Sequence, residues 1–465
     1  TRYMSEVTIT FLGATDTVTG SRFLVTSEKS KVLVDCGLFQ GIKSIRKKNW
    51  DPFPVDVKTI DSVVLTHAHL DHCGYLPLLA RQGYENPIFA TQYTAELASV
   101  ILHDSAHLQM EDAKYAAKKG YSKHEIPLAL YNVEDAENAL KLFKRVEFNS
   151  RIQVAPDAWV KWYPSGHILG SAFIVLEIAD KKVMFTGDMG RNNHPLLSNP
   201  DAPPTEPMDA IVTESTYGDK IHDAKPEDFA KELNAAIKRG GSILIPAFAV
   251  DRTEVILMAL RDLMEKKQIP LIPIYVDSPM ALAALNFYRD AISHDTAEIR
   301  EGVSERWANQ DPFDAGKLMQ ALTTEESKKI NDITETSIII SASGMATGGR
   351  VVHHLENMLP DSKNTVILVG YQAVGSRGRL LEEGVTELKM HGKLVPVAAH
   401  IAKVESFSVH ADADELIAWM RQAGKPAQVF VIHGEQGAQE AMAMRITDEL
   451  GWNSVIPKPS QVITL

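Results

Sequence analysis

The chain has 465 residues, of which 45% are hydrophobic and 23% are charged, a composition typical of soluble globular proteins and a length that predicts two domains. No uninterrupted apolar stretch reaches the roughly 18 residues that span a bilayer, so we expect no membrane contact. The net charge of −12 argues against a general nucleic-acid coat, although it allows a nuclease with a narrow basic channel.

The first part of the chain predicts a β-rich opening, a helical segment and a return to strands. Short strands separated by turn residues are expected at 7–12, 21–26, 31–36 and 62–65, with a helix at 75–82. Residues 94–143 have a helical composition with breaks near Gly120 and Pro127. Further strands are expected at 159–163, 171–178, 182–186 and 210–213.

The densest group of ligand-type residues directly follows the strand at 62–65. His67, His69, Asp71 and His72 lie within six residues of one another. A solvated polar loop is the ordinary alternative, but buried imidazoles and carboxylates need partners. Nitrogen and carboxylate oxygen suit zinc or a similar first-row ion, and the uneven spacing lets one loop supply two adjacent centres. The pattern therefore predicts a loop that binds two metal ions.

Four more residues of the right type follow predicted strands. Asp35 ends the strand at 31–36, His167 lies in a glycine-flanked segment, and Asp188 and His433 each follow an apolar run. Taken singly, such residues are more often structural histidines or turn-forming aspartates. Their occurrence together with the His67–His72 loop favours a shared metal centre.

From about residue 228 the pattern changes to alternating helices and short apolar strands. Helices are expected at 229–238, 253–267 and 351–358, and strands at 242–245, 272–276, 337–341 and 365–369. This alternation predicts a parallel α/β sheet covered on both faces. After residue 397 come a loop, a helix at 412–423, a strand at 428–432 and His433. Because ligand-type residues stand on both sides of the α/β block, we expect that block to be an insertion.

The HAHLDH loop together with the later His167, Asp188 and His433 resembles the metallo-β-lactamase superfamily. The resemblance implies two Zn²⁺ ions per chain. One would take His67, His69 and His167, the other Asp71, His72 and His433, and Asp188 would bridge them. Asp35 matches an early aspartate of the family that orients ligands without binding metal itself.

Residues 213–219 (TESTYGD) and 406–412 (SFSVHAD) resemble motifs of the β-CASP group of that superfamily, which includes the endonuclease subunit of the mRNA 3′-end cleavage factor. Val409 stands where alanine is usual. The resemblance implies an α/β fold, a metallo-β-lactamase αββα sandwich with an inserted parallel-sheet β-CASP cap. The metallo-β-lactamase domain would comprise 1–214 and 397–465, and the insertion 215–396. A histidine at position 433 implies RNA rather than DNA as the substrate.

The residues implied by this resemblance are those that hydrolysis of a phosphodiester bond requires. Two metal ions roughly 3.5–4 Å apart generate hydroxide near neutral pH and neutralise charge on the phosphate. We expect Asp71, Glu214 and His410 to be catalytic, with His410 as the general acid and Glu214 holding its other ring nitrogen. The ordinary alternatives are a strand-end carboxylate that bonds a local turn and a structural histidine. Water attack would leave a 5′-phosphate and a 3′-hydroxyl.

Two glycine-rich stretches, at 343–349 and 375–378, follow or lie between predicted strands of the insertion. Glycine-rich turns there can present backbone N–H groups to phosphate. With nearby basic and hydroxyl side chains they predict an RNA backbone path. Its candidate residues are Arg252, Ser343, Arg350, Ser376 and Arg377.

The leading hypothesis is a zinc-dependent endoribonuclease that acts on single-stranded RNA. Exonuclease action from the 5′ end, a small-molecule metallohydrolase and a noncatalytic scaffold subunit of an RNA-processing assembly are the alternatives. The sequence is compatible with either a monomer or a homodimer. The two cysteines, Cys36 and Cys73, cannot staple a chain of this length, which indicates a reducing cytoplasm.

Overall fold

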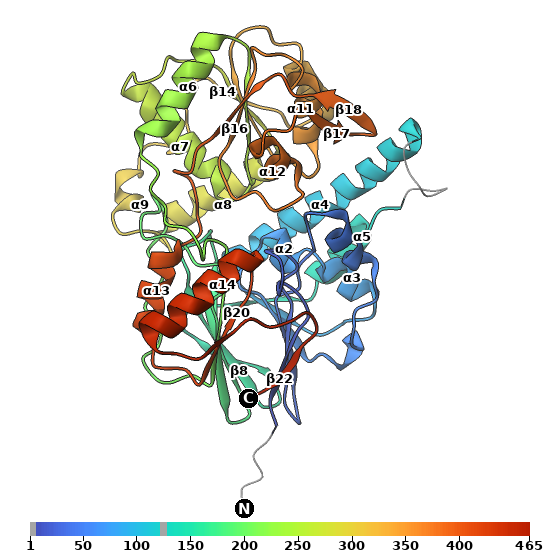
Figure 1. Cartoon of the computed structure of the whole chain (residues 1–465), viewed down its shortest axis with the longest axis vertical. Helices are drawn as coiled ribbons and strands as arrows, with labels where there is room; N and C mark the ends of the chain where they lie inside the picture. Colours follow the sequence, from blue (N-terminus) through green and yellow to red (C-terminus); the bar gives the residue numbers. More distant parts are fainter. Residues whose placement is uncertain (1–5, 121–127) are drawn as a thin grey trace, which may run out of the picture.

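The computed structural model describes residues 6–120 and 128–465. It has two lobes (Figure 1). The two ends of the chain build one lobe and the middle of the chain builds the other, as expected for an insertion. The break expected near Pro127 lies outside the described residues. Within the described chain, no helix is long and apolar enough to cross a membrane.

The lobe that contains both chain ends is built on two seven-stranded sheets. In spatial order, the first sheet consists of β22 (Val462–Thr464), β1 (Thr8–Phe11), β2 (Phe23–Thr26), β3 (Lys31–Val34), β4 (Ser62–Val64), β5 (Ile88–Thr91) and β6 (Phe143–Val146). The second consists of β21 (Ser454–Val455), β20 (Gln428–Val431), β11 (Ala210–Thr213), β10 (Lys181–Phe185), β9 (Ala172–Ile178), β8 (Ala158–Pro164) and β7 (Arg151–Ala155).

Alternating side chains pack these sheets against each other and against outer helices. Phe23 and Val25 of β2 join Phe430 of β20 in the core between the sheets. Leu24, between them in sequence, faces the opposite way into the helical layer of α3 (Leu76–Arg81), α4 (Gln92–Lys119) and α5 (Val133–Leu140). Val431 faces the second helical layer, α13 (Ala413–Arg421) and α14 (Gln436–Arg445). The result is the predicted αββα sandwich.

The inserted lobe contains a six-stranded sheet in which neighbouring strands are parallel. Its order is β14 (Leu318–Gln320), β13 (Ile274–Asp277), β15 (Ile338–Ser341), β12 (Ile243–Pro246), β16 (Thr365–Leu368) and β19 (His400–Lys403). Each residue of β12, β15 and β16 is buried, which explains their continuous apolar runs. The predicted parallel α/β insertion is confirmed.

Helices flank this sheet on both faces. They are α6 (Glu227–Arg239), α7 (Arg252–Glu265), α8 (Pro279–His294), α9 (Val303–Arg306), α10 (Thr324–Ile330), α11 (Arg350–Met358) and α12 (Arg377–Glu382). A two-stranded hairpin, β17 (Glu387–Met390) and β18 (Lys393–Pro396), projects beside α11. Two further short helices, α1 (Lys43–Arg46) and α2 (Leu70–Cys73), lie in the first part of the chain.

The structure differs from the sequence expectations mainly in short or edge elements. Strands β5, β6 and β7 and helix α8 were not among the expected elements, and β6 begins within the segment expected to be helical. Three of the four residues of β6 are charged or only partly buried, because it is an edge strand. Strand β19 pairs with β16, so the expected boundary at 396/397 falls before the last strand of the inserted sheet.

Candidate metal centre

The predicted metal ligands, together with Asp35 and Glu214, gather because their segments follow the carboxyl ends of strands. In the second sheet, β8, β10, β11 and β20 run in the same direction and are followed by His167, Asp188, Glu214 and His433, respectively. In the first sheet, the parallel strands β3 and β4 are followed by Asp35 and by the loop that carries His67 to His72. The ends of both sheets meet at one rim of the sandwich.

Backbone hydrogen bonds hold the metal loop against the segment after β3. Cys36 N donates to the His72 carbonyl at 2.8 Å, and Leu38 N donates to Leu70 at 2.9 Å. Between them Gly37 lies so close to the loop that a Cβ atom there would stand 1.6 Å from the Asp71 carbonyl oxygen. The short backbone-to-backbone approach therefore requires glycine.

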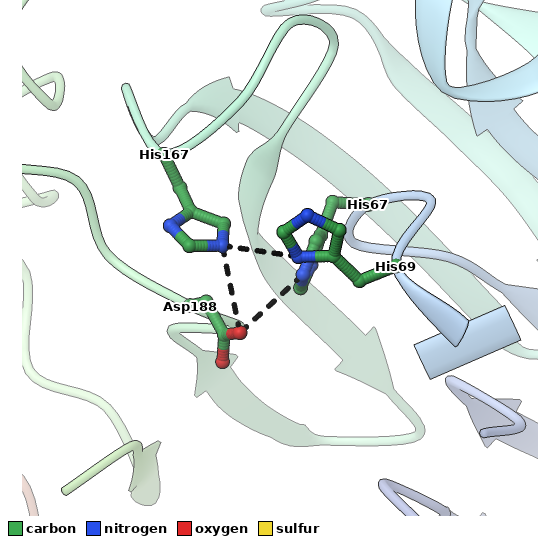
Figure 2. A group of neighbouring side chains, drawn as sticks. All are labelled: His67, His69, His167 and Asp188. Atoms are coloured by element: carbon green, nitrogen blue, oxygen red, sulfur yellow. Dashed lines mark hydrogen bonds and ion pairs between the residues drawn. The ribbon is translucent and has the colours of Figure 1, made fainter. Parts of the chain in front are cut away.

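One donor group consists of three histidines around Asp188 (Figure 2). Asp188 Oδ2 lies 3.4 Å from His67 Nε2 and 3.6 Å from His167 Nε2. His69 turns its Nδ1 toward His167 Nε2, at 3.4 Å. The four ligand atoms lie within 4.8 Å of one another. This is the set of residues expected for the first metal ion together with its bridging aspartate.

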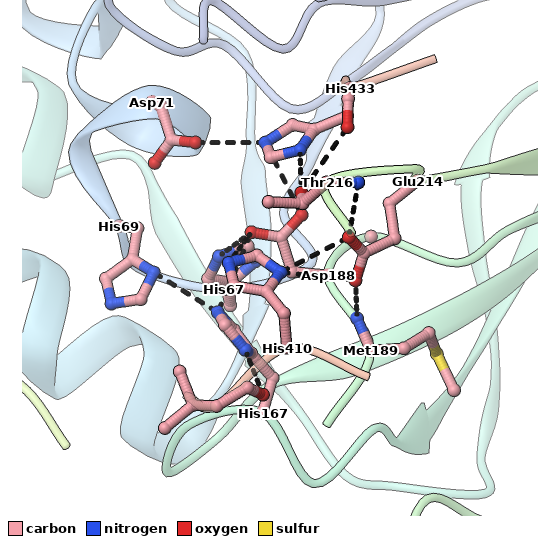
Figure 3. Close-up of polar contacts among 12 residues, drawn as sticks. His67, His69, Asp71, His167, Asp188, Met189, Glu214, Thr216, His410 and His433 are labelled. Carbon is pink, nitrogen blue, oxygen red and sulfur yellow. Dashed lines mark hydrogen bonds and ion pairs between the residues drawn. The ribbon is translucent and has the colours of Figure 1, made fainter. Parts of the chain in front are cut away.

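A second donor group shares Asp188 and contains Asp71, His72 and His433 (Figure 3). Asp188 lies 3.3 Å from His72 Nε2 and 3.5 Å from His433 Nε2. Asp71 Oδ2 lies 3.1 Å from His433 Nε2. The second expected ligand set therefore also converges.

The chemistry of these donors fits divalent cations. Among the described residues, His67 Nε2 and Asp188 Oδ1 in these groups are buried without a hydrogen-bond partner. In addition, His72 Nε2 and His433 Nε2 face each other at 3.3 Å, although two unprotonated ring nitrogens repel. A cation between such lone pairs would satisfy them, and nitrogen and carboxylate donors suit zinc.

A second layer of hydrogen bonds orients four of the histidines. Asp35 Oδ2 accepts from His72 Nδ1 at 2.8 Å, and the Val409 carbonyl accepts from His167 Nδ1 at 3.0 Å. Thr66 and Thr216 hydroxyls lie 3.1 Å and 2.9 Å from Nδ1 of His67 and His433. The Asp35 carboxylate and the Val409 carbonyl can only accept, so the ring protons of His72 and His167 lie on Nδ1 and Nε2 is free to bind metal. The two threonine hydroxyls can accept in the same way from His67 and His433.

Thr66, Thr216 and the Val409 carbonyl were absent from the sequence prediction. Thr66 directly precedes His67, and Thr216 lies within the TESTYGD motif. These positions are the only local indication of their role in the sequence. A backbone carbonyl has no sequence signal of its own.

Burial keeps the first three histidines neutral. It lowers the pKa of His67 to about 3 and that of His69 to about 4, and it takes the pKa of His167 well below the usual range. Neutral imidazoles are the form that binds a metal. These three rings therefore do not need to lose a proton on metal binding at neutral pH.

His410 lies beside the two donor groups and pairs with a carboxylate that belongs to neither of them. Its Nδ1 lies 3.2 Å from Glu214 Oε2, and its Nε2 lies 3.9 Å from Asp188 Oδ2. Burial lowers the pKa of His410, but the carboxylates of Glu214 and Asp188 outweigh burial and raise that pKa above its usual value. Glu214 is itself fixed, because its Oε1 accepts from Met189 N at 2.7 Å.

The centre opens into a cavity of about 230 Å³ between the two lobes. His69, Asp71, Asp188, His410 and His433 line its metal side. The inserted lobe contributes Phe248, Arg252, Ser343 and Tyr371, and α4 contributes Asp104 and Asp112. The insertion therefore covers the metal centre as a cap.

The residues predicted to contact RNA phosphate do not all reach this cavity. Arg252 and Ser343 line it, although Arg252 is almost fully buried and donates to the Val369 carbonyl. Arg350, Ser376 and Arg377 are not among the described residues that line it. Arg350 pairs with Asp277 at 2.7 Å, Ser376 caps α12, and Arg377 donates to the Thr347 carbonyl at 3.0 Å.

Three family models together match most of the chain. Residues 24–215 match a metallo-beta-lactamase superfamily domain, and residues 253–381 match a Beta-Casp domain. Residues 394–457 match a Zn-dependent metallo-hydrolase RNA specificity domain.

Curated relatives match over nearly the full length. A ribonuclease from Thermus thermophilus is 34% identical over 91% of this chain and 92% of the relative. An RNase J-like protein from Methanocaldococcus jannaschii is 32% identical over 99% of this chain and 100% of the relative. The Integrator complex subunit 11 of Gallus gallus is 27% identical over 99% of this chain and 74% of the relative.

A solved structure of a protein of unknown function from Enterococcus faecalis superposes with a TM-score of 0.51 at 12% identity. It covers 99% of this chain and 100% of that chain. At this identity the similarity concerns the fold alone.

Proposed function

Because the chain belongs to the β-CASP group of the metallo-β-lactamase superfamily, we propose that it is a zinc-dependent ribonuclease that hydrolyses phosphodiester bonds of single-stranded RNA. The observation that carries the proposal is the position of His410. Its ring is held by Glu214, lies beside the aspartate shared by both donor groups, and lines the cavity.

Two zinc ions per chain fit the two donor groups. His67, His69 and His167 would hold one, Asp71, His72 and His433 the other, and Asp188 would bridge them. When bound, such ions activate water as a nucleophile and neutralise charge on the scissile phosphate.

The protein's own contribution to bond cleavage would be a proton. Since Glu214 accepts the Nδ1 proton of His410, the Nε2 proton points to the cavity and can pass to the departing 3′ oxygen. The products would be a 3′-hydroxyl and a 5′-phosphate. Asp71, which also lines the cavity, would combine metal binding with positioning of the reacting groups.

RNA as substrate is supported by two findings. Two relatives carry names of ribonucleases, and residues 394–457 match the RNA specificity domain. A narrow cavity under a cap would fit a single strand better than a duplex. We favour internal cleavage, with 5′-to-3′ exonuclease action as the alternative.

A cleavage assay tests the proposal. Purified protein should cut labelled single-stranded RNA, and a chelator should abolish cleavage. Circular RNA separates the two modes, because it has no end and only an endonuclease can cut it. Absence of RNA cleavage by protein that holds two zinc ions would favour the scaffold or small-molecule hydrolase alternatives.

The variant His410→Ala tests the acid. It should retain zinc and lose about 10²- to 10⁴-fold in cleavage rate, the usual contribution of a general acid. His400→Ala, on exposed β19, is the matched control and should cut normally. Normal cleavage by His410→Ala would overturn the assignment.

A further inference from the structure

Three side chains with good metal-binding chemistry meet on the inserted lobe outside the centre described above. His353 and Glu356 lie on α11, and His391 lies in the turn between β17 and β18. One potential ligand atom from each lies within 4.8 Å of the others. None of the three is among the described residues that line the cavity or belong to the two donor groups.

Local structure brings the three together. His353 and Glu356 are three residues apart in α11, so they occupy neighbouring positions on one helix face. The hairpin lies beside this face (Figure 1) and places the His391 ring 4.4 Å from the His353 ring, measured between centroids. His391 Nδ1 lies 2.8 Å from Glu356 Oε2.

The turn conformation makes the identity of residue 391 informative. Met390 pairs with Lys393, so His391 and Gly392 form a two-residue turn, with φ of 48° and 77°. Such a turn favours asparagine or glycine at its first position. Histidine is one of the few non-glycine residues enriched in this backbone region, so the turn accommodates a potential metal ligand at position 391.

The cluster offers a carboxylate and two imidazoles to a cation, although Lys393 lies beside Glu356 and the charge of Lys328 acts on His353. Lys393 Nζ lies 3.4 Å from Glu356 Oε1 and so occupies the oxygen that does not face His391. Burial, followed by the charge of His391, lowers the pKa of His353. Burial raises the pKa of Glu356, but the hydrogen bond and charge of His391 and the contact with Lys393 outweigh it. A neutral imidazole and a carboxylate are therefore present near neutral pH.

We propose that His353, Glu356 and His391 bind a further zinc ion, separate from the two at the metal centre. Two histidines and a carboxylate leave at least one coordination position open to water, because the cluster lies at the surface.

The site lies where the two lobes touch. Tyr115 near the end of α4, which belongs to the first lobe, packs against both histidine rings, with centroid separations of 5.5 Å from His353 and 4.6 Å from His391. A bound ion would hold the hairpin on α11 at this contact. The site would therefore stiffen the cap from outside the cavity.

Zinc counting tests the proposal without reference to activity. Wild-type protein, dialysed against micromolar zinc and measured by mass spectrometry of the metal, should carry one equivalent more than His391→Asn. Asparagine suits the turn, so this variant removes the ligand and keeps the hairpin. Glu356→Gln should lose the same equivalent. His400→Asn, a histidine on β19 with exposed surroundings, should lose none.

Equal zinc content in the wild type and in both ligand variants would overturn the proposal and leave the cluster as a hydrogen-bonded anchor of the hairpin. The count is a difference between variants, so it does not depend on occupancy of the metal centre. His391→Asn should also cut RNA at the wild-type rate, so a failure here is separate from a failure of the ribonuclease assignment.

Discussion

At the scale of single residues, Asp35 shows how a group that binds no metal can control the centre. Its Oδ1 accepts from Thr66 N at 2.8 Å, and its Oδ2 accepts from both the Thr66 hydroxyl and His72 Nδ1. Because Thr66 in turn contacts His67, one carboxylate orients a ligand of each donor group. The geometry of both donor groups therefore depends on one buried side chain.

Replacing Asp35 by asparagine should weaken zinc binding by about 10- to 100-fold, the usual effect of removing an outer partner. The amide has one oxygen, so its NH₂ group would face at least one of the three donors. Competition with a chromophoric chelator measures the affinity. Asp414→Asn, an exposed carboxylate that pairs with Arg445, is the control and should bind zinc normally. Wild-type affinity in Asp35→Asn would refute this role.

At the scale of elements, the metal loop depends on its contact with the segment after β3. Ser21 N donates to the Asp71 carbonyl at 2.9 Å, and Cys36 N donates to that of His72. These bonds hold a ligand-rich loop in place through backbone atoms. The loop position is therefore sensitive to any side chain added at Gly37.

Gly37→Ala should displace the loop, because the new Cβ would stand 1.6 Å from Asp71 O and 2.7 Å from His72 N. We expect lost zinc and a destabilisation of about 1–3 kcal/mol, as for other overpacked sites. Metal analysis and thermal denaturation check both. Gly437→Ala is the matched control, since no atom lies within 4 Å of its added Cβ. Full zinc content in Gly37→Ala would contradict the expected displacement.

At the scale of the whole molecule, a buried polar network joins the insertion to the metal lobe. Asp251, just before α7, accepts from Tyr288 OH at 2.7 Å and from His194 Nε2 at 2.8 Å. Tyr288 OH in turn accepts from Leu169 N, two residues after the predicted ligand His167. The insertion therefore supports a ligand loop as well as covering the cavity.

Asp251→Ala should destabilise the protein by about 1–3 kcal/mol for each donor left unpaired, here Tyr288 and His194. Zinc affinity should fall as well, because the loop of His167 loses its support. Chemical denaturation and chelator competition give the two values. Asp262→Ala, at an exposed position on α7, should change stability by less than about 0.5 kcal/mol. Unchanged stability in Asp251→Ala would show that the lobes are held by other contacts.

Removing bound metal should lower the stability of the whole folded protein. A ligand present at 100 times its Kd stabilises the folded state by about 2.7 kcal/mol, so a chelator should lower the melting temperature measurably. His410→Ala should show the same shift as the wild type, because it keeps both donor groups. His67→Ala should show a smaller one. An equal shift in all three proteins would argue against His67 as a ligand.

From local patterns alone, the sequence predicted the inserted parallel sheet and the loop of metal-binding residues, whereas the sandwich and the assignment of ligands to two groups came from the resemblance to a known family. Alternation in β2 directs Phe23 and Leu24 to opposite faces, and His167, Asp188 and His433 each come shortly after a strand end. Edge elements such as β6 and β19 were missed or misplaced because their residues are half exposed and carry little pattern.

The tertiary structure decided what depends on contacts between distant segments. It pairs His167 with the Val409 carbonyl across 242 residues and brings His194 and Tyr288 to Asp251. It also pairs Arg350 with Asp277, uses Ser376 to cap α12, and places His391 beside Glu356 of α11. The physical reason is that local patterns set which face of an element is buried, whereas the packing of whole faces sets which side chains meet. The ligands and Asp35 could be predicted because they belong to sequence motifs near strand ends, whereas the contacts of Thr66, Thr216 and the Val409 carbonyl could not, because they depend on how distant loops pack together.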